Sequence, residues 1–101
     1  MKRFFYFELS TTDSMLVSVD NFLGGETHTD AASIHLNFQG IEGDADESLA
    51  DLVITSGKSQ EGFKAICNLA NSGTEPFIVI ADVTNGIFCH PDITGIAALT
   101  E

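Results

Sequence analysis

A strict alternation of apolar and polar residues over residues 33–39 limits the fold more than any other feature of this sequence. The apolar positions are Ile34, Leu36 and Phe38, and polar side chains stand between and after them. A period of two is the spacing of a β-strand that packs one face on a core and turns the other to water. The segment therefore predicts a strand of an antiparallel sheet with one wet face.

Other segments carry weaker strand signals. Residues 5–9 and 15–19 alternate in the same way around a turn-forming segment at residues 10–14, which predicts a hairpin. Residues 21–25 continue or bend its second strand. An Asn-Gly pair at residues 85–86 is a strong signal for a second hairpin. The remaining expected strands are residues 52–55, 77–81, 87–89 and 93–99.

One amphipathic helix is predicted at about residues 59–72. Apolar residues recur there at helical spacing, and they are Phe63, Ile66, Cys67 and Ala70. Ser59 is the candidate N-cap, Gly73 stands where a C-terminal cap belongs, and Pro76 prevents the helix from continuing.

These elements predict a mostly β (α+β) fold in one domain, residues 1–101. We expect a small, strongly bent antiparallel sheet, or a partly open barrel, of six to seven strands. The helix would lie between the fourth strand and a C-terminal hairpin. A flat sheet with the helix on one face is the alternative.

The sequence repeats its pattern weakly at a shift of 72 residues. Residues 5–7 align with residues 77–79, and residues 12–17 align with residues 84–89. The echo has two explanations: all hairpins look alike, or two equivalent hairpins occupy related places in one sheet.

The charge of the chain excludes two classes of partner. The chain has 15 acidic and four basic residues, which gives a formal net charge of −11. Nucleic acids and anionic membranes both need clustered basic side chains, so we expect neither partner. The simplest interpretation of the excess of acidic residues is that it keeps the protein soluble or adapts it to salty surroundings. A cationic protein partner or a divalent cation stays open.

We expect no transmembrane helix and no signal peptide in this sequence. No apolar run is long enough to span a bilayer, and the N-terminal apolar stretch is too short for a signal peptide. Cys67 and Cys89 have no disulfide-framework spacing, which favours reduced thiols and a cytoplasmic location. Whether they pair stays open.

Candidate metal ligands occur in two places. The acidic loop at residues 40–51 contains Asp44, Asp46 and Glu47, without the full ladder of a calcium loop. His90 and Asp92 flank Pro91 at a strand end. A solvated loop and a turn are the alternative interpretations, and we expect no metal, no cofactor and no catalytic residue.

Residues 55–59 imitate a phosphate-binding loop between a strand and a helix. The full motif needs a glycine five residues before Gly57, where this chain has Leu52. The segment therefore predicts an ordinary strand-to-helix turn rather than a nucleotide site.

Two resemblances follow from these patterns. In outline, the six or seven strands with one helix resemble small Sm-like and SH3-like barrels, although Sm proteins usually place their helix before the first strand. Residues 15–21 and 91–96 resemble small uncharacterised proteins of marine phage or marine environmental origin. That resemblance implies a virion-associated or unknown role and supplies no site residues.

We therefore expect a non-catalytic, self-associating structural or accessory protein. Strand edges and the aromatic surface near the N-terminus would form the contact between copies, because the chain has nine aromatic residues to bury. A module that binds a small ligand or a divalent cation is the alternative, and a small enzyme is the second alternative.

Overall fold

The computed structural model of the chain describes residues 3–27, 33–39, 48–72 and 75–100. Within these residues it contains eight strands, one α-helix and one short 3₁₀ helix. In chain order the elements are β1 (Phe4–Ser10), β2 (Asp13–Ser18), η1 (Val19–Asn21), β3 (Phe22–Thr27), β4 (Ser33–Phe38), β5 (Ser48–Ile54), α1 (Ser59–Ser72), β6 (Phe77–Asp82), β7 (Ile87–Phe88) and β8 (Ile93–Thr100).

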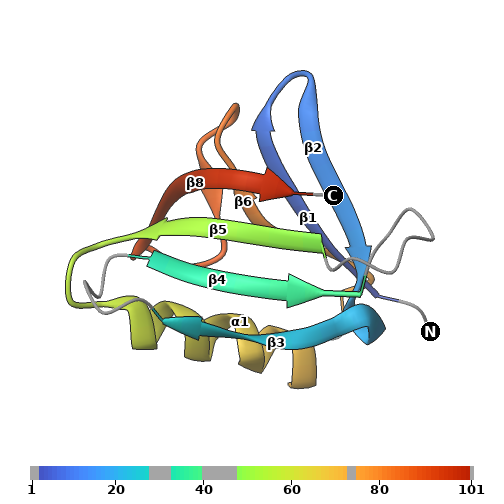
Figure 1. Ribbon diagram of the computed structural model, residues 1–101, viewed down its shortest axis with the longest axis horizontal. Helices are drawn as coiled ribbons and strands as arrows, with labels where there is room; N and C mark the ends of the chain where they lie inside the picture. Colours follow the sequence, from blue (N-terminus) through green and yellow to red (C-terminus); the bar gives the residue numbers. More distant parts are fainter. Residues whose placement is uncertain (1–2, 28–32, 40–47, 73–74, 101) are drawn as a thin grey trace.

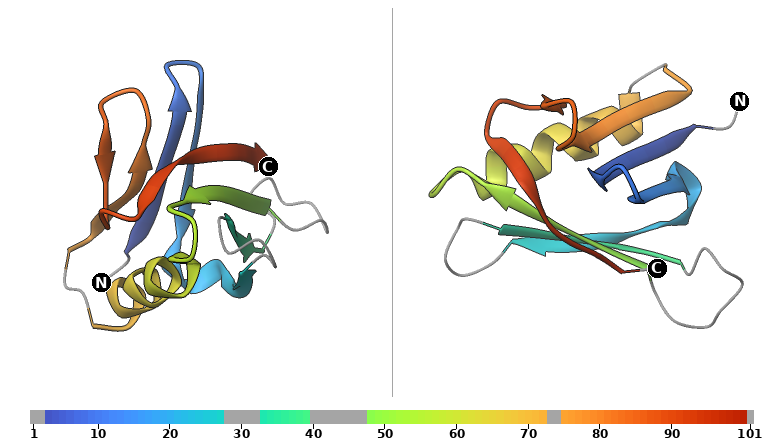
Figure 2. Two further views of the ribbon diagram at one scale, coloured as in Figure 1. Left: turned by 90° about the vertical axis from the view of Figure 1, so that its left-hand side faces the viewer. Right: turned by 90° about the horizontal axis from the view of Figure 1, so that it is seen from above.

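The strands form two four-stranded sheets that do not close into a barrel (Figure 1). Sheet A has the order β2-β1-β6-β7, and sheet B has the order β3-β4-β5-β8. Neighbouring strands are antiparallel except β1 and β6, which are parallel. The two sheets lie at an angle to each other, and α1 runs beside β3 and β4 (Figure 2).

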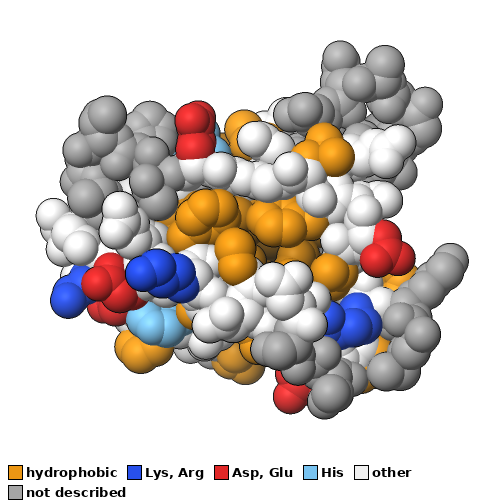
Figure 3. Space-filling view, turned by 90° about the horizontal axis from the view of Figure 1, so that it is seen from below, with side chains coloured by type: hydrophobic (Ala, Val, Ile, Leu, Met, Phe, Trp, Pro, Cys, Tyr) orange, Lys and Arg blue, Asp and Glu red, His pale blue; other side chains and the backbone are white. Residues whose placement is uncertain are grey.

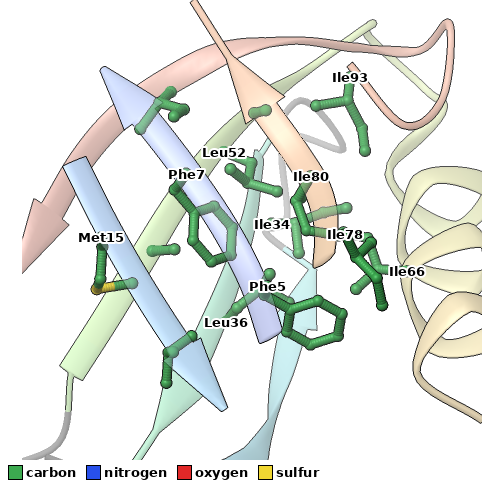
Figure 4. Close-up of a cluster of buried hydrophobic side chains, with 14 of the residues drawn as sticks. Phe5, Phe7, Met15, Ile34, Leu36, Leu52, Ile66, Ile78, Ile80 and Ile93 are labelled. Carbon is green, nitrogen blue, oxygen red and sulfur yellow. The ribbon is translucent and has the colours of Figure 1, made fainter. Parts of the chain in front are cut away.

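The core fills the space between the two sheets and α1 (Figure 4). Ile34, Leu36 and Phe38 are fully buried, so the row predicted on one face of this strand is confirmed. The Phe38 ring packs edge-to-face on two rings of β1, with centroids 6.1 Å from Phe5 and 5.9 Å from Phe7. These contacts join sheet B to sheet A, because edge-to-face packing of buried rings adds to their area burial.

The predicted fold class is confirmed: the protein is mostly β, with one helix at residues 59–72. Two details differ from the prediction. The described residues contain eight strands rather than six or seven, and the helix follows the fifth strand rather than the fourth. The extra strand arises at η1, where the Ser18 side chain accepts a hydrogen bond from the Asp20 main-chain N–H and divides residues 15–25 between two sheets.

A third difference concerns residues 48–51, which the sequence pattern places in the acidic loop. They form the first half of β5, and they pair with β4 on one side and with β8 on the other. The strand was not evident because Asp51 interrupts the apolar run at a position that faces away from the core. Tertiary pairing with two neighbours outweighs this local signal.

The two hairpins of the internal echo lie side by side in sheet A. Strand β1 of the first hairpin pairs directly with β6 of the second, with Tyr6 opposite Val79. The hairpins therefore occupy related places in one sheet, as the sharper of the two explanations requires. Gly86, in the left-handed region at φ 67°, lies in the predicted Asn-Gly turn.

The N-cap of helix α1 is Lys58, one residue before the predicted cap, Ser59. The Lys58 carbonyl accepts the first helical hydrogen bond, from the Gly62 N–H at 3.1 Å, so Ser59 lies in the first turn. A Cβ on Gly62 would approach a methyl group of Ile34 at 3.3 Å, which shows how closely α1 packs on sheet B. The predicted C-terminal cap, Gly73, lies outside the described residues.

Candidate interaction surface

The candidate metal ligands do not form a cluster in the part of the chain that the structure describes. Asp44, Asp46 and Glu47 lie outside the described residues. His90 Nδ1 is 3.7 Å from Asp92 Oδ2, and the same nitrogen accepts a hydrogen bond of 3.1 Å from the Asp92 main-chain N–H. No group of three His, Cys, Asp or Glu side chains with metal-binding geometry occurs among the described residues. The His90–Asp92 contact is thus the local bonding of a turn.

Sequence reasoning missed a second histidine–carboxylate pair. His35 of β4 and Asp51 of β5 lie directly opposite each other, with Nε2 3.1 Å from Oδ1. The contact has an ion-pair distance without hydrogen-bond geometry, so among the described residues the buried Asp51 Oδ1 lacks a hydrogen-bond donor. Only the register of β4 and β5 brings the two groups together, and that register was hidden while residues 48–51 were expected in a loop.

The segment that imitates a phosphate loop is a tight turn. The Lys58 N–H donates to the Thr55 carbonyl at 2.9 Å, and Gly57 has a φ of 82°. The turn occupies the Lys58 N–H that a phosphate-binding loop would direct at a ligand.

Both thiols are free. Burial raises the pKa of the Cys89 thiol from 9.0 to about 11. Cys89 is therefore protonated at neutral pH, and a protonated thiol is a poor nucleophile and a poor metal ligand.

The outer face of sheet A is apolar across its three longest strands. We use this term for the side of sheet A that points away from the core. Tyr6 of β1 pairs with Leu16 of β2 on one side and with Val79 of β6 on the other, so the three side chains form a row. Phe4 and Phe77 pair in the same way beside this row.

Several large side chains of this face are exposed to solvent. Leu16 is 50% exposed and Phe77 is 52% exposed. The Phe77 ring stacks against the Tyr6 ring at a centroid distance of 5.3 Å. Ile87, opposite Asp82 in the β6–β7 pair, is 53% exposed. Monomeric proteins rarely expose contiguous apolar patches of several large side chains, so this face is a candidate interaction surface.

The polar groups of the outer face include two carboxylates, that of Glu8 and that of the buried Asp82. The Tyr6 hydroxyl donates a hydrogen bond to Glu8, and this hydrogen bond is the main reason that the pKa of Tyr6 is raised above 10.0. Glu8 is paired with Asp82, whose carboxylate accepts bonds from the main-chain N–H and the side-chain amide of Asn85. The prediction of an aromatic surface near the N-terminus is wrong for Phe5 and Phe7, which are fully buried in the core. Tyr6 lies on the outer face, beside Phe77 of β6.

Among the described residues, each sheet ends in two strands that have a neighbour on one side only. Strands β2 and β7 end sheet A, and β3 and β8 end sheet B. Strand β2 is the longer of the two edges of sheet A, with six residues against two. An edge of this kind has unpaired main-chain groups that can pair with another strand.

Within the residues described, no helix has both the length and the hydrophobicity needed to cross a bilayer. Comparisons of this chain with protein-family models, with curated proteins and with solved structures found no match.

Proposed function

We propose that this protein is a non-catalytic structural or accessory protein that associates with copies of itself through the outer face of sheet A. The observation that carries the proposal is the row formed by Leu16, Tyr6 and Val79, with the Tyr6–Phe77 stack beside it. The resemblance to small marine phage proteins would make it a virion or phage accessory component. A cytoplasmic protein that assembles through the outer face of sheet A is equally consistent with this surface.

The expected free energies of burial and association indicate a contact that covers more than three half-exposed side chains. Full burial of a large apolar side chain contributes about 1.5–3 kcal/mol, so three half-exposed ones contribute about 3 kcal/mol when covered. Association costs at least about 4 kcal/mol in lost translational and rotational freedom. The outer face therefore needs additional contacts, and the open main-chain groups of β2 lie next to Leu16 to supply them.

The experiment is size-exclusion chromatography with light scattering on the wild-type chain over a dilution series. We expect an oligomer that dissociates on dilution. Leu16→Ser should shift the equilibrium toward monomer, because the side chain is half exposed and its loss removes surface from the contact without opening the core. A monomer at the highest attainable concentration would exclude self-association.

A matched control exists on the other sheet. Val53 of β5 is 39% exposed, and it belongs to sheet B. Val53→Ser removes a comparable apolar group from a surface outside the proposed contact, so it should leave the dissociation constant unchanged. Equal weakening by both substitutions would indicate non-specific hydrophobic association instead.

A further inference from the structure

The pairing of β2 with β1 determines which main-chain groups of β2 stay open. The Val19 N–H donates to the Arg3 carbonyl at 2.9 Å, so residues 15, 17 and 19 turn their main-chain groups toward β1. The residues between them turn theirs to the opposite side, because these groups alternate along an antiparallel strand. The open groups, which we call the β2 edge, are the N–H and C=O of Ser14 and Leu16 and the N–H of Ser18. The Ser18 carbonyl is not counted, because Ser18 is the N-cap of η1 and an N-cap carbonyl accepts the first bond of its helix.

The β2 edge is the least protected of the four strand edges in the described part of the chain. Residues 14–18 contain no charged residue and no proline, and their pairing with β1 has no register shift. Strand β7 has only two residues, and the pairing of β8 with β5 shifts register twice. Short strands and bulges of this kind protect an edge from pairing with another chain.

Strand β3, the other edge of sheet B, is less suited to pairing than β2. Its pairing with β4 shifts register between Phe22 and Gly24, and Glu26 is exposed on it. Strand β3 lies beside α1 (Figure 1), and Figure 3 shows this side of the molecule, where acidic and basic side chains lie around a group of apolar ones. The uninterrupted and uncharged edge is therefore that of β2.

The β2 edge is complementary to itself. Two β2 strands can run antiparallel with Leu16 opposite Leu16 of the partner subunit. Leu16 then exchanges its N–H and C=O with Leu16 of the partner subunit, and each Ser18 N–H meets the Ser14 carbonyl across the contact. Asp13 lies opposite Val19 of the partner subunit, so no two carboxylates face each other.

This register is the one that fits the side chains. A shift of one residue would place open main-chain groups opposite groups that already bond β1. A shift of two residues would place Leu16 opposite a serine, Ser14 or Ser18. With Leu16 opposite its own copy, two side chains that are each 50% exposed cover one another.

We infer that copies of the chain join through an antiparallel pairing of two β2 strands, centred on Leu16 and related by a two-fold axis. The pairing rests on the proposed function, self-association, and specifies the geometry of its contact. Sheet A then continues through both copies, and the row of Leu16, Tyr6 and Val79 meets the same row at the two-fold axis. The outer face doubles in width, and the edge contact by itself closes at a dimer, because it uses the β2 edge of both copies.

The first test removes one main-chain donor of the β2 edge. Ser18 has a φ of −62°, close to the value of about −65° at which proline is fixed, and its N–H does not bond β1. Ser18→Ala is the matched control for Ser18→Pro. Both variants lose the side chain that accepts the bond from the Asp20 N–H, and only Ser18→Pro loses the main-chain N–H.

Light scattering after size exclusion over a dilution series compares these two variants. Ser18→Pro should dissociate at a concentration at least about tenfold higher than Ser18→Ala, because each dimer loses a hydrogen bond on both sides of the axis. Circular dichroism checks that both variants fold. Should Ser18→Pro not fold, hydrogen exchange of the wild-type Leu16 amide replaces it: the amide should be protected in the dimer and exchange freely after dilution to the monomer.

The second test places charges at the two-fold axis. Leu16→Lys alone and Leu16→Glu alone each bring like charges opposite each other, so each should associate at least about tenfold more weakly than wild type. An equimolar mixture brings opposite charges together and should restore the dimer at concentrations where either variant alone is monomeric. Val53→Lys and Val53→Glu make the same charge changes on sheet B, and mixing them should have no effect.

Four results would overturn the pairing. If Ser18→Pro and Ser18→Ala associate equally and the Leu16 mixture gives no dimer, the contact lies elsewhere, and self-association stands without the β2 edge. If the mixture gives a dimer but proline has no effect, or the Leu16 amide exchanges equally in both states, the outer faces pack on each other around Leu16 instead. An effect of proline without a dimer in the mixture would exclude the register centred on Leu16. A monomeric wild type would overturn the proposed function and the pairing together.

Discussion

The guanidinium of Arg3 donates a hydrogen bond of 2.7 Å to the main-chain carbonyl of Ala70, 67 residues along the chain. The same group bonds the Leu69 carbonyl, and its Nε donates to the Glu75 carbonyl at 3.2 Å. The last carbonyls of a helix have no partner within the helix, and the helix dipole places negative charge there. A positive group from the N-terminal strand therefore closes the C-terminal end of α1.

Replacing Arg3 by alanine should lower the free energy of unfolding by about 1.5–3 kcal/mol, the range for a hydrogen-bonded charged group. Urea denaturation followed by circular dichroism measures this loss. Lys64→Ala is the matched control, because Lys64 is an exposed cation on the same helix, and it should cost less than about 0.5 kcal/mol. Similar losses for the two variants would contradict a capping role for Arg3.

Gly25 is required by the close approach of β3 to β4. A Cβ at this position would lie 2.4 Å from the His35 carbonyl oxygen, which is main chain and cannot move independently. Gly25→Ala should therefore destabilise the protein by about 1–3 kcal/mol, as overpacking does. At Gly95 a Cβ would meet only Val53, at 3.8 Å, so Gly95→Ala should be tolerated. Thermal unfolding of both variants makes the comparison.

The contact of His35 with Asp51 predicts an asymmetry between single and double substitutions. His35→Val removes the imidazole that lies 3.1 Å from Asp51 Oδ1 and should lower the free energy of unfolding by about 0.2–1 kcal/mol, the range for a part-exposed pair. His35→Val/Asp51→Val replaces both polar groups by a cross-strand apolar pair and should recover most of that loss. Urea denaturation of the two single variants and the double variant gives the coupling energy. Additive losses would show that the two side chains act independently.

Cys89 predicts a loss of stability at alkaline pH. The pKa of its thiol is about 11 in the folded protein against 9.0 ordinarily, so the unfolded chain loses this proton first as the pH rises. The contribution of the protonated, buried thiol to the free energy of unfolding is fully present below pH 9. Between pH 9 and pH 11 this contribution falls by about 2 kcal/mol. Tyr6, whose pKa is also raised, changes stability in the same direction.

The variant Cys89→Ala separates the effect of the thiol on the pH dependence of stability from the effect of Tyr6. The variant keeps Tyr6, so the difference in unfolding free energy between wild type and variant isolates the thiol. That difference should be constant up to pH 9 and should then shrink toward pH 11. A difference that stays constant across the whole range would show that the thiol titrates normally in the folded protein.

The sequence was sufficient where one strand carries its own pattern. Ile34, Leu36 and Phe38 alternate without interruption, and their burial follows from that local period. The helix at residues 59–72 followed from its apolar spacing in the same way. The strand at residues 48–51 was missed because its pairing with β4 and β8 is a property of distant segments.

The interaction surface was only partly predictable for the same reason. Leu16 lies between two buried residues, so its outward direction was readable from alternation. Its place beside Tyr6 and Val79 depends on β1 lying between β2 and β6, and parallel pairing across about 70 residues leaves no short-range signal. The contact of Arg3 with the C-terminal end of α1 was equally hidden, because Arg3 reaches the helix only through the fold.

The parallel pairing of β1 with β6 also dictates the order of events during synthesis. Strand β1 is made first, yet one of its two edges stays open until residues 77–82 have left the ribosome. Contacts between such distant segments slow folding, because a long loop must close before the pairing contributes any stability. The nascent hairpin of β1 and β2 therefore keeps an open strand edge, which can pair with other chains, until residues 77–82 are available.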